Sequence, residues 1–180
     1  MPEPYDTPKS TAIETMTRRA CLVGGSSVAV LAALWWTRGP DARAGGTFEV
    51  VKTDDEWRRL LKPEAYKVLR HEATERPYSS PLNGEKRKGI FACAGCDLPL
   101  FSSETKFESG TGWPSFYQPI EGNVGKTEDR TFGMVRTEVH CRRCGGHLGH
   151  VFDDGPKPTG LRYCMDGFAL LFHPATPSAS

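Results

Sequence analysis

The apolar and polar positions follow a helical pattern in one short part of the chain and a strand pattern in most of the rest. Charged and apolar residues recur at helical spacing in residues 54–69. Asp54 and Asp55 are placed to open one helix, and Pro63 is placed to open another, because proline is favoured in a first helical turn. We therefore expect two short helices here.

The pattern changes from Gly89 onward, where glycines and prolines separate short apolar runs. Such runs are typical of short strands joined by turns. The runs expected to be strands are residues 90–92, 133–135 and 169–172. The body of the protein is therefore predicted to be mostly antiparallel β, and residues 174–180 to be a disordered tail.

An earlier apolar run, residues 22–36, is interrupted only by small residues. It follows Arg18-Arg19 and precedes Ala42-Arg43-Ala44, which fits an Ala-x-Ala cleavage site. This arrangement resembles a twin-arginine export signal, so we expect residues 1–44 to be removed and the protein to be exported, for instance to the periplasm. The alternative is an uncleaved membrane anchor, but roughly 15 residues is short for a span of about 20.

Cysteine spacing indicates a metal site. Two Cys-x-x-Cys pairs are present, formed by Cys93 with Cys96 and by Cys141 with Cys144. Two intervening residues let both sulfurs of a pair reach one ion at about 2.3 Å, and zinc takes four such thiolates. We therefore expect one structural zinc ion. Two disulfides among these four cysteines would be the alternative; either way, Cys164 is left unpaired once Cys21 departs with the signal.

Length and charge limit the remaining possibilities. A chain of 180 residues with 38% apolar side chains suits one ordinary core, so a single domain over residues 45–173 is expected. Beyond residue 44 the chain keeps 18 of its 23 basic and 18 of its 22 acidic side chains. A zinc ribbon that binds DNA or RNA normally has a basic excess on one face, so no nucleic-acid partner is expected.

The unpaired Cys164 is the first candidate for chemistry. Arg162 precedes it by two residues, and in an extended segment the two side chains share a face, so the guanidinium could stabilise a thiolate. His147 and His150 are candidate proton donors because imidazole titrates near neutrality. Asp154 could orient one of them.

Each of these residues also has an ordinary structural explanation. Cys164 could be an inert, small apolar residue. The two histidines follow Cys144 and could bind zinc, although four thiolates already fill a tetrahedral site. Arg162 and Asp154 could form a surface ion pair, and Trp113 could simply be part of the core.

Four motifs resemble those of the type B methionine sulfoxide reductases, in the same order and at compatible spacing. They are RHEATE at residues 70–75, GWPSF at 112–116, GGHLGHVFDDGP at 145–156 and GLRYC at 160–164. The resemblance covers roughly residues 48–172. It implies an enzyme that reduces the R epimer of methionine sulfoxide in oxidised proteins.

The resemblance also implies roles for single residues. Trp113 matches a tryptophan that packs against the methyl group of the substrate, and Asp166 is expected at the same substrate site. The catalytic residues that it implies are Cys164 as nucleophile, together with His147, His150, Arg162 and Asp154.

Two positions depart from the family pattern. Thr111 stands where many members carry a second, resolving cysteine, so a sulfenic acid on Cys164 should be reduced by an external thiol, either a thioredoxin-like protein or a small thiol. Asp166 stands where members that use cysteine commonly carry asparagine. A carboxylate there would raise the pKa of the thiol unless Arg162 offsets it, or Asp166 could be protonated and donate a hydrogen bond.

The sequence thus predicts a mainly β, exported, monomeric enzyme with two small antiparallel sheets, short N-terminal helices and a four-cysteine zinc site. Two other classes remain open. One is a zinc-ribbon-like binding module that has lost the chemistry, and the other is a thiol-based sensor or peroxide scavenger.

Overall fold

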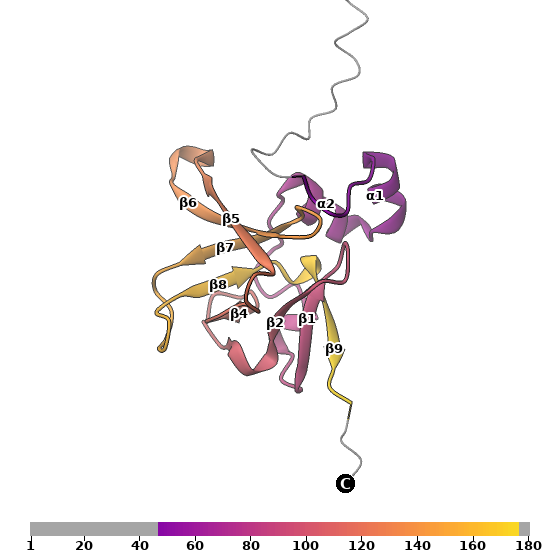
Figure 1. The fold of residues 1–180 in the computed structure, drawn as a ribbon. Coiled ribbons are helices and arrows are strands. Elements are labelled where there is room, and N and C mark those ends of the chain that lie inside the picture. The colour runs from indigo at the N-terminus through magenta and orange to yellow at the C-terminus, as the bar shows by residue number, and fades with distance from the viewer. Residues whose placement is uncertain (1–46, 177–180) are drawn as a thin grey trace, which may run out of the picture. The chain divides into compact units, whose positions relative to one another are not determined.

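The computed structural model describes residues 47–176, which form two short helices followed by two antiparallel sheets (Figure 1). The predicted export signal, its cleavage site after Ala44 and residues 177–180 lie outside the described residues. Within residues 47–176, no helix has the length and apolar character needed to cross a membrane. The mainly β prediction is confirmed.

The two predicted helices are α1, Asp54–Leu60, and α2, Pro63–His71. Thr53 caps α1 through a reciprocal pair of bonds: its hydroxyl accepts from the Glu56 N–H at 3.4 Å, and its own N–H donates to the Glu56 carboxylate at 2.7 Å. Proline opens α2, as the sequence predicts. The helices bury Trp57 and Leu69, which become part of the core.

The first sheet has three strands in the order β2-β1-β9. Their bounds are Gly89–Cys93 for β1, Pro99–Ser102 for β2 and Leu170–Pro174 for β9. The predicted strands at residues 90–92 and 169–172 correspond to β1 and β9, except that Ala169 lies in a 3-10 turn. β9 also continues through Pro174, which pairs with Gly89, so the ordered chain extends into the predicted tail.

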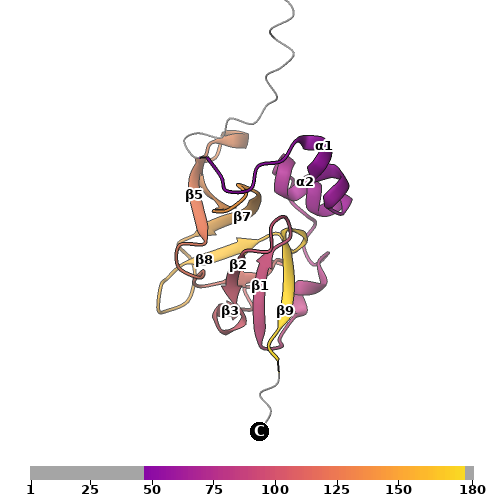
Figure 2. The ribbon, with the colours of Figure 1, turned by 45° about the vertical axis from the view of Figure 1, so that its right-hand side comes forward.

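The second sheet has six strands in the order β3-β4-β8-β7-β6-β5. Their bounds are Lys106–Phe107 for β3, Ser115–Phe116 for β4, Val124–Asp129 for β5, Arg136–Cys141 for β6, His147–Phe152 for β7 and Arg162–Met165 for β8. Figure 2 shows the strands of the first sheet side by side, with β7 and β8 of the second sheet crossing near their upper ends.

The strand predicted at residues 133–135 is wrong. Gly133 ends a 3-10 turn with φ +71°, and the N–H of Met134 donates to the Thr131 carbonyl at 3.2 Å. The side chains of Met134 and Val135 are 50% and 68% exposed. This apolar run therefore lies in the β5–β6 connection, and β6 begins only at Arg136.

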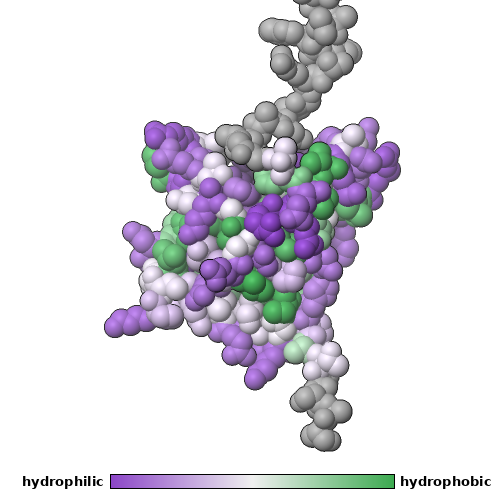
Figure 3. All heavy atoms as spheres, viewed as in Figure 1, coloured by the Kyte–Doolittle hydropathy of each residue, from purple (hydrophilic) through white to green (hydrophobic). Residues whose placement is uncertain are grey.

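Aromatic side chains join the two sheets. Phe101 of β2 and Phe116 of β4 stack with ring centroids 4.4 Å apart, and Phe91 of β1 meets Phe116 edge to face at 5.0 Å. All three are fully buried. Such pairs add to the burial of their own apolar area. The outer face drawn in Figure 3 is largely hydrophilic, with smaller apolar areas between.

Candidate active site

The four cysteines of the two Cys-x-x-Cys pairs, each pair called a knuckle below, form one cluster at the junction of the two sheets. Cys93 ends β1 in the first sheet and Cys141 ends β6 in the second. The four sulfurs lie within 4.8 Å of one another, with Cys93 3.7 Å from Cys144 and Cys96 3.5 Å from Cys141. A tetrahedron of thiolates about 2.3 Å from a metal has edges of about 3.8 Å. The donor set therefore fits one zinc ion, as predicted, and not two disulfides.

Tight turns hold this cluster. In the second knuckle the Gly145 N–H donates to the Cys141 carbonyl at 2.9 Å, and Gly145 has φ +68°. A Cβ at this glycine would approach the Phe48 ring to 2.4 Å. Because the ligands come from the ends of strands in both sheets, the metal would hold the sheets together and take no part in the reaction.

Cys164 lies on β8, which is between β4 and β7 in the second sheet. Its cross-strand partners are Ser115 on β4 and His150 on β7. Directly paired residues of an antiparallel sheet present their side chains on the same face, so the predicted nucleophile and one predicted proton donor are neighbours. The Cys164 sulfur also lies 3.8 Å from the hydroxyl of Thr111.

The environment of this thiol has opposing effects on its ionisation. Burial raises the pKa of Cys164, whereas the hydrogen bond with Thr111 and the charge of Arg162 lower it. The carboxylate of Asp166 acts with burial and against the thiolate. Arg162 thus has the effect predicted from its spacing, and Asp166 has the unfavourable effect expected of a like charge.

Asp154 forms an ion pair with Arg162, which the sequence left open as the alternative to orienting a histidine. It forms two bonds with Arg162, from Nε and Nη2 at 2.8 Å each, and these bonds lower the pKa of the Asp154 carboxyl. The guanidinium also lies over the Phe152 ring, 4.3 Å from its centroid. Asp154 therefore holds Arg162 in place, and the carboxylates that contact His147 and His150 are Glu138 and Asp129.

Asp129 is the partner of His150, and no sequence pattern indicated it. Its carboxylate lies 2.9 Å from His150 Nε2 and 2.6 Å from Arg136 Nη2. Hydrogen bonds from Thr131, followed by those from His150 and Arg136, lower the pKa of Asp129. Burial lowers the pKa of His150, and the bond to Asp129 opposes that effect. An ionised carboxylate therefore orients this imidazole.

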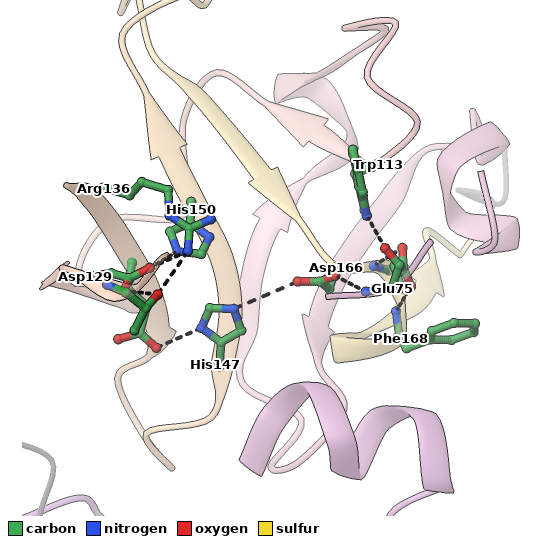
Figure 4. A network of polar contacts seen from close by, with 11 residues as sticks. Glu75, Trp113, Asp129, Arg136, His147, His150, Asp166 and Phe168 are labelled. Carbon is green, nitrogen blue, oxygen red and sulfur yellow. Dashed lines mark hydrogen bonds and ion pairs between the residues drawn. The ribbon is translucent and has the colours of Figure 1, made fainter. Parts of the chain in front are cut away.

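His147 lies between two carboxyl groups (Figure 4). Its Nδ1 is 2.8 Å from Glu138, and its Nε2 is 3.9 Å from Asp166, too far for a direct hydrogen bond. The ring is 2% exposed, and its Nε2 has no hydrogen-bond partner among the described residues. The His147 and His150 rings meet edge to face, 5.4 Å apart, and both line a cavity of about 230 Å³. Neither is close enough to the sulfur cluster to be one of its ligands.

Glu75 forms hydrogen bonds with Trp113, with Asp166 and with the turn after β8. Its N–H donates to Asp166 Oδ1 at 2.9 Å, its carbonyl accepts from the indole N–H of Trp113 at 3.1 Å, and its carboxylate accepts from the N–H groups of Gly167 and Phe168 at 2.8 and 3.1 Å. Figure 4 shows these contacts as one connected group. Trp113 is thus linked, through Glu75, to the turn that follows Cys164, the predicted nucleophile. Glu75 stands in the RHEATE motif, which was the available signal.

Close approach of β7 to β8 depends on Gly149. This residue has φ +143°, and a Cβ there would lie 2.2 Å from the Cys164 carbonyl oxygen. Only glycine allows the two strands to pair at this point without a clash. The HLGH motif therefore supplies two imidazoles and also the glycine that this strand pairing requires.

Asp166 gives the site a testable pH dependence. Burial raises the pKa of Asp166 from 3.8 to about 6. Because the folded-state pKa is the higher one, the stabilising contribution of this group is fully present below pH 3.8 and is lost as the pH rises through about 6. Asp166→Asn keeps an acceptor for the Glu75 N–H but cannot ionise. We expect the variant to be more stable than the wild type by about 2 to 3 kcal/mol at pH 8, and by much less at pH 4.

Urea unfolding at pH 4 and pH 8 measures this difference. Asp153→Asn, at an exposed position, is the control for loss of a carboxylate alone. A stability difference for Asp166→Asn that is the same at both pH values would contradict the assignment.

Comparisons with known proteins agree with this geometry. A family model described as the SelR domain matches residues 61–174. The peptide methionine sulfoxide reductase MsrB of Agrobacterium fabrum is 54% identical over 127 residues, which cover 70% of this chain and 94% of that protein. The MsrB of Pseudomonas putida is 56% identical over 127 residues, covering 70% and 96%, and that of Methanosarcina barkeri is 56% identical over 124 residues, covering 68% and 87%. The chain therefore belongs to the SelR-domain family of type B methionine sulfoxide reductases.

Proposed function

We propose that this protein reduces the R epimer of methionine sulfoxide in oxidised proteins to methionine, with Cys164 as nucleophile. The observation that carries the proposal is the position of this thiol on β8, paired with His150 across the sheet and in contact with Thr111. Arg162, held by Asp154, adds positive charge on the same strand. Reduction of a sulfoxide requires a soft nucleophile and a proton donor, and a nearby cation favours the thiolate.

The reaction transfers one oxygen atom between two sulfur atoms. Cys164 gives up its thiol proton and its sulfur takes the oxygen, so that thiol plus sulfoxide become sulfenic acid plus thioether. The oxygen must gain a proton as its bond to the methionine sulfur breaks. We assign the imidazole of His150, oriented by Asp129, to take the thiol proton and pass it to this oxygen. Trp113 would contact the methyl group, a role that suits its apolar ring.

The sulfenic acid must then be reduced from outside. The cysteines of residues 47–176 are the four of the zinc cluster and Cys164 itself. One external thiol would form a mixed disulfide with Cys164 and release water, and a second would restore the free thiol. A thioredoxin-like protein or a small thiol can fill this role.

We propose the location and the assembly state on the basis of other features. The twin-arginine pattern in residues 1–44 supports export to the periplasm, followed by cleavage after Ala44. A monomer is supported by the largely hydrophilic face in Figure 3. The N-terminal sequence of the exported form tests export and cleavage. Light scattering of the mature protein measures its assembly state.

The test of the proposed function is an assay with the separated R and S epimers of a methionine sulfoxide peptide, with dithiothreitol as reductant. We expect only one epimer to be reduced, because a single arrangement of Trp113, the thiol and the proton donor accepts one configuration at sulfur. The family resemblance implies that this is the R epimer. Absence of turnover with either epimer, in a folded protein with zinc bound, would favour the binding module. Oxidation of Cys164 by peroxide without sulfoxide turnover would favour the sensor.

A further inference from the structure

Three hydroxyl groups form a continuous chain that ends at the Cys164 sulfur. Thr111 Oγ1 lies 3.8 Å from that sulfur, Ser109 Oγ lies 2.8 Å from Thr111 Oγ1, and Ser115 Oγ lies 2.7 Å from Ser109 Oγ. Ser115 Oγ also lies 3.1 Å from the Trp113 carbonyl, to which it can donate. The chain therefore runs from the reacting atom to the backbone of the substrate-site tryptophan.

The two ends of this hydroxyl chain, the Cys164 sulfur and the Trp113 carbonyl, fix the directions of its hydrogen bonds. The hydroxyl chain contains four hydrogen-bond contacts, and each hydroxyl supplies one proton. When Cys164 is a thiol, its own proton makes four, and all four links are satisfied if every donor points away from the sulfur, toward Trp113. When Cys164 is a thiolate, three protons remain, and the three hydroxyls can all turn toward the sulfur.

The second arrangement leaves a complete series of donors, from Ser115 to Ser109, to Thr111 and to the thiolate. The link that it gives up is the one from Ser115 to the Trp113 carbonyl. Ser109 stays anchored in both arrangements, because its oxygen also accepts from the Thr111 N–H at 3.4 Å. Chains of hydrogen bonds polarise one another, and bonds to an ionised acceptor are the stronger ones.

Charged groups around the thiol also act on it. On β8, Arg162 is held by Asp154 and favours the thiolate through its charge and a hydrogen bond. On β7, His150 is held by Asp129. Asp166, beyond the end of β8, opposes the thiolate, and His147 faces that carboxyl group. From the loop before β4, the Thr111 hydroxyl reaches the sulfur at 3.8 Å. The Thr111 hydroxyl is therefore the nearest neutral donor available to the thiolate.

We propose that Thr111 is a catalytic residue that donates a hydrogen bond to the Cys164 thiolate, and that Ser109 is a positioning residue that turns the Thr111 hydroxyl toward the sulfur. The importance of this hydrogen bond for catalysis rests on the proposed function. The hydrogen bond itself can be tested independently, because ionisation of the Cys164 thiol can be followed without any sulfoxide.

The test compares Thr111→Val with Thr111→Ser. Valine keeps the shape of threonine and loses the hydroxyl, whereas serine keeps the hydroxyl. The rate of alkylation by iodoacetamide is measured from pH 6 to pH 10 on the zinc-bound full chain, by mass spectrometry of the peptide that contains Cys164. We expect valine to raise the pKa of Cys164 by about 1, which slows alkylation at pH 7 up to about tenfold, and serine to restore the wild-type profile.

Ser109→Ala tests the positioning role. It should slow alkylation at pH 7 by about twofold, since Thr111 keeps its hydroxyl but loses the donor behind it. Zinc content and melting temperature report whether each variant is folded. If valine disturbs the loop, Thr111→Ala gives the same comparison with a smaller side chain.

Wild-type pH profiles in folded Thr111→Val, or in its alanine substitute, would overturn the proposal. A wild-type profile in Ser109→Ala alone would overturn the role of Ser109. Failure of the proposed function would look different: the wild-type protein would reduce no sulfoxide, while the alkylation profiles would still respond to Thr111.

Discussion

Replacing Cys164 by serine should abolish reduction of methionine sulfoxide, with a fall in turnover of at least about a thousandfold. The hydroxyl of serine is smaller and far less nucleophilic toward sulfur, and it cannot form the sulfenic acid. The side chain lies on β8 between two paired strands, so the substitution removes one sulfur atom from a partly buried position without changing the strand register. Turnover of the R epimer with dithiothreitol is the measurement.

The fold is the control for this substitution. The zinc content and melting temperature of Cys164→Ser should match those of the wild type, because Cys164 is not part of the sulfur cluster. Turnover within about tenfold of the wild-type rate would show that the nucleophile has been wrongly assigned.

Loss of the metal should have the second large effect. Cys93 and Cys141 are fully buried at the ends of strands in different sheets, and a single ion would join them. Structural zinc contributes about 10–16 kcal/mol of apparent binding free energy in small zinc domains, which is comparable to the total stability of a typical domain. We expect Cys93→Ser, or removal of zinc by a chelator, to lower the melting temperature by at least about 15 °C.

Calorimetry and metal analysis measure this effect, with Cys164→Ser as the matched cysteine substitution outside the cluster. A Cys93→Ser protein that is free of zinc and melts within a few degrees of the wild type would contradict a structural role for the metal. Restoration of the wild-type melting temperature by added zinc is expected after chelation, but not after substitution.

Local signals were enough to predict the helices and the metal site. Asp54 and Asp55 mark the start of one helix and Pro63 the start of the other, because the preferences for these residues act within the first helical turn. The spacing of each Cys-x-x-Cys pair likewise depends only on the turn between its two cysteines. The strand predicted at residues 133–135 failed because apolar composition does not report the positive φ of Gly133. An apolar run forms a buried strand only where other parts of the fold cover it, and the run itself does not show whether they do.

Partners that are distant in sequence were not predictable in the same way. The position of Asp154 near both histidines and Arg162 could not decide between these partners, and the structure shows the bond to Arg162. Asp129 comes from the end of β5 to meet His150, a contact that no sequence pattern indicated. Glu75 reaches the turn after β8 from a segment about 90 residues away, a separation that no periodicity reveals. The pairing of β5 with β6 and of β6 with β7 places Asp129, whereas Glu75 lies outside the strands.

The most direct test of the account is a single-turnover reaction without reductant. The full-length protein, mixed with excess R-epimer peptide, should release one equivalent of methionine peptide and gain one oxygen atom on Cys164, which dimedone would trap as a sulfenic acid. The S epimer and the Cys164→Ser variant should give neither product. Methionine formed without oxygen on Cys164, or oxygen found on another residue, would contradict the mechanism.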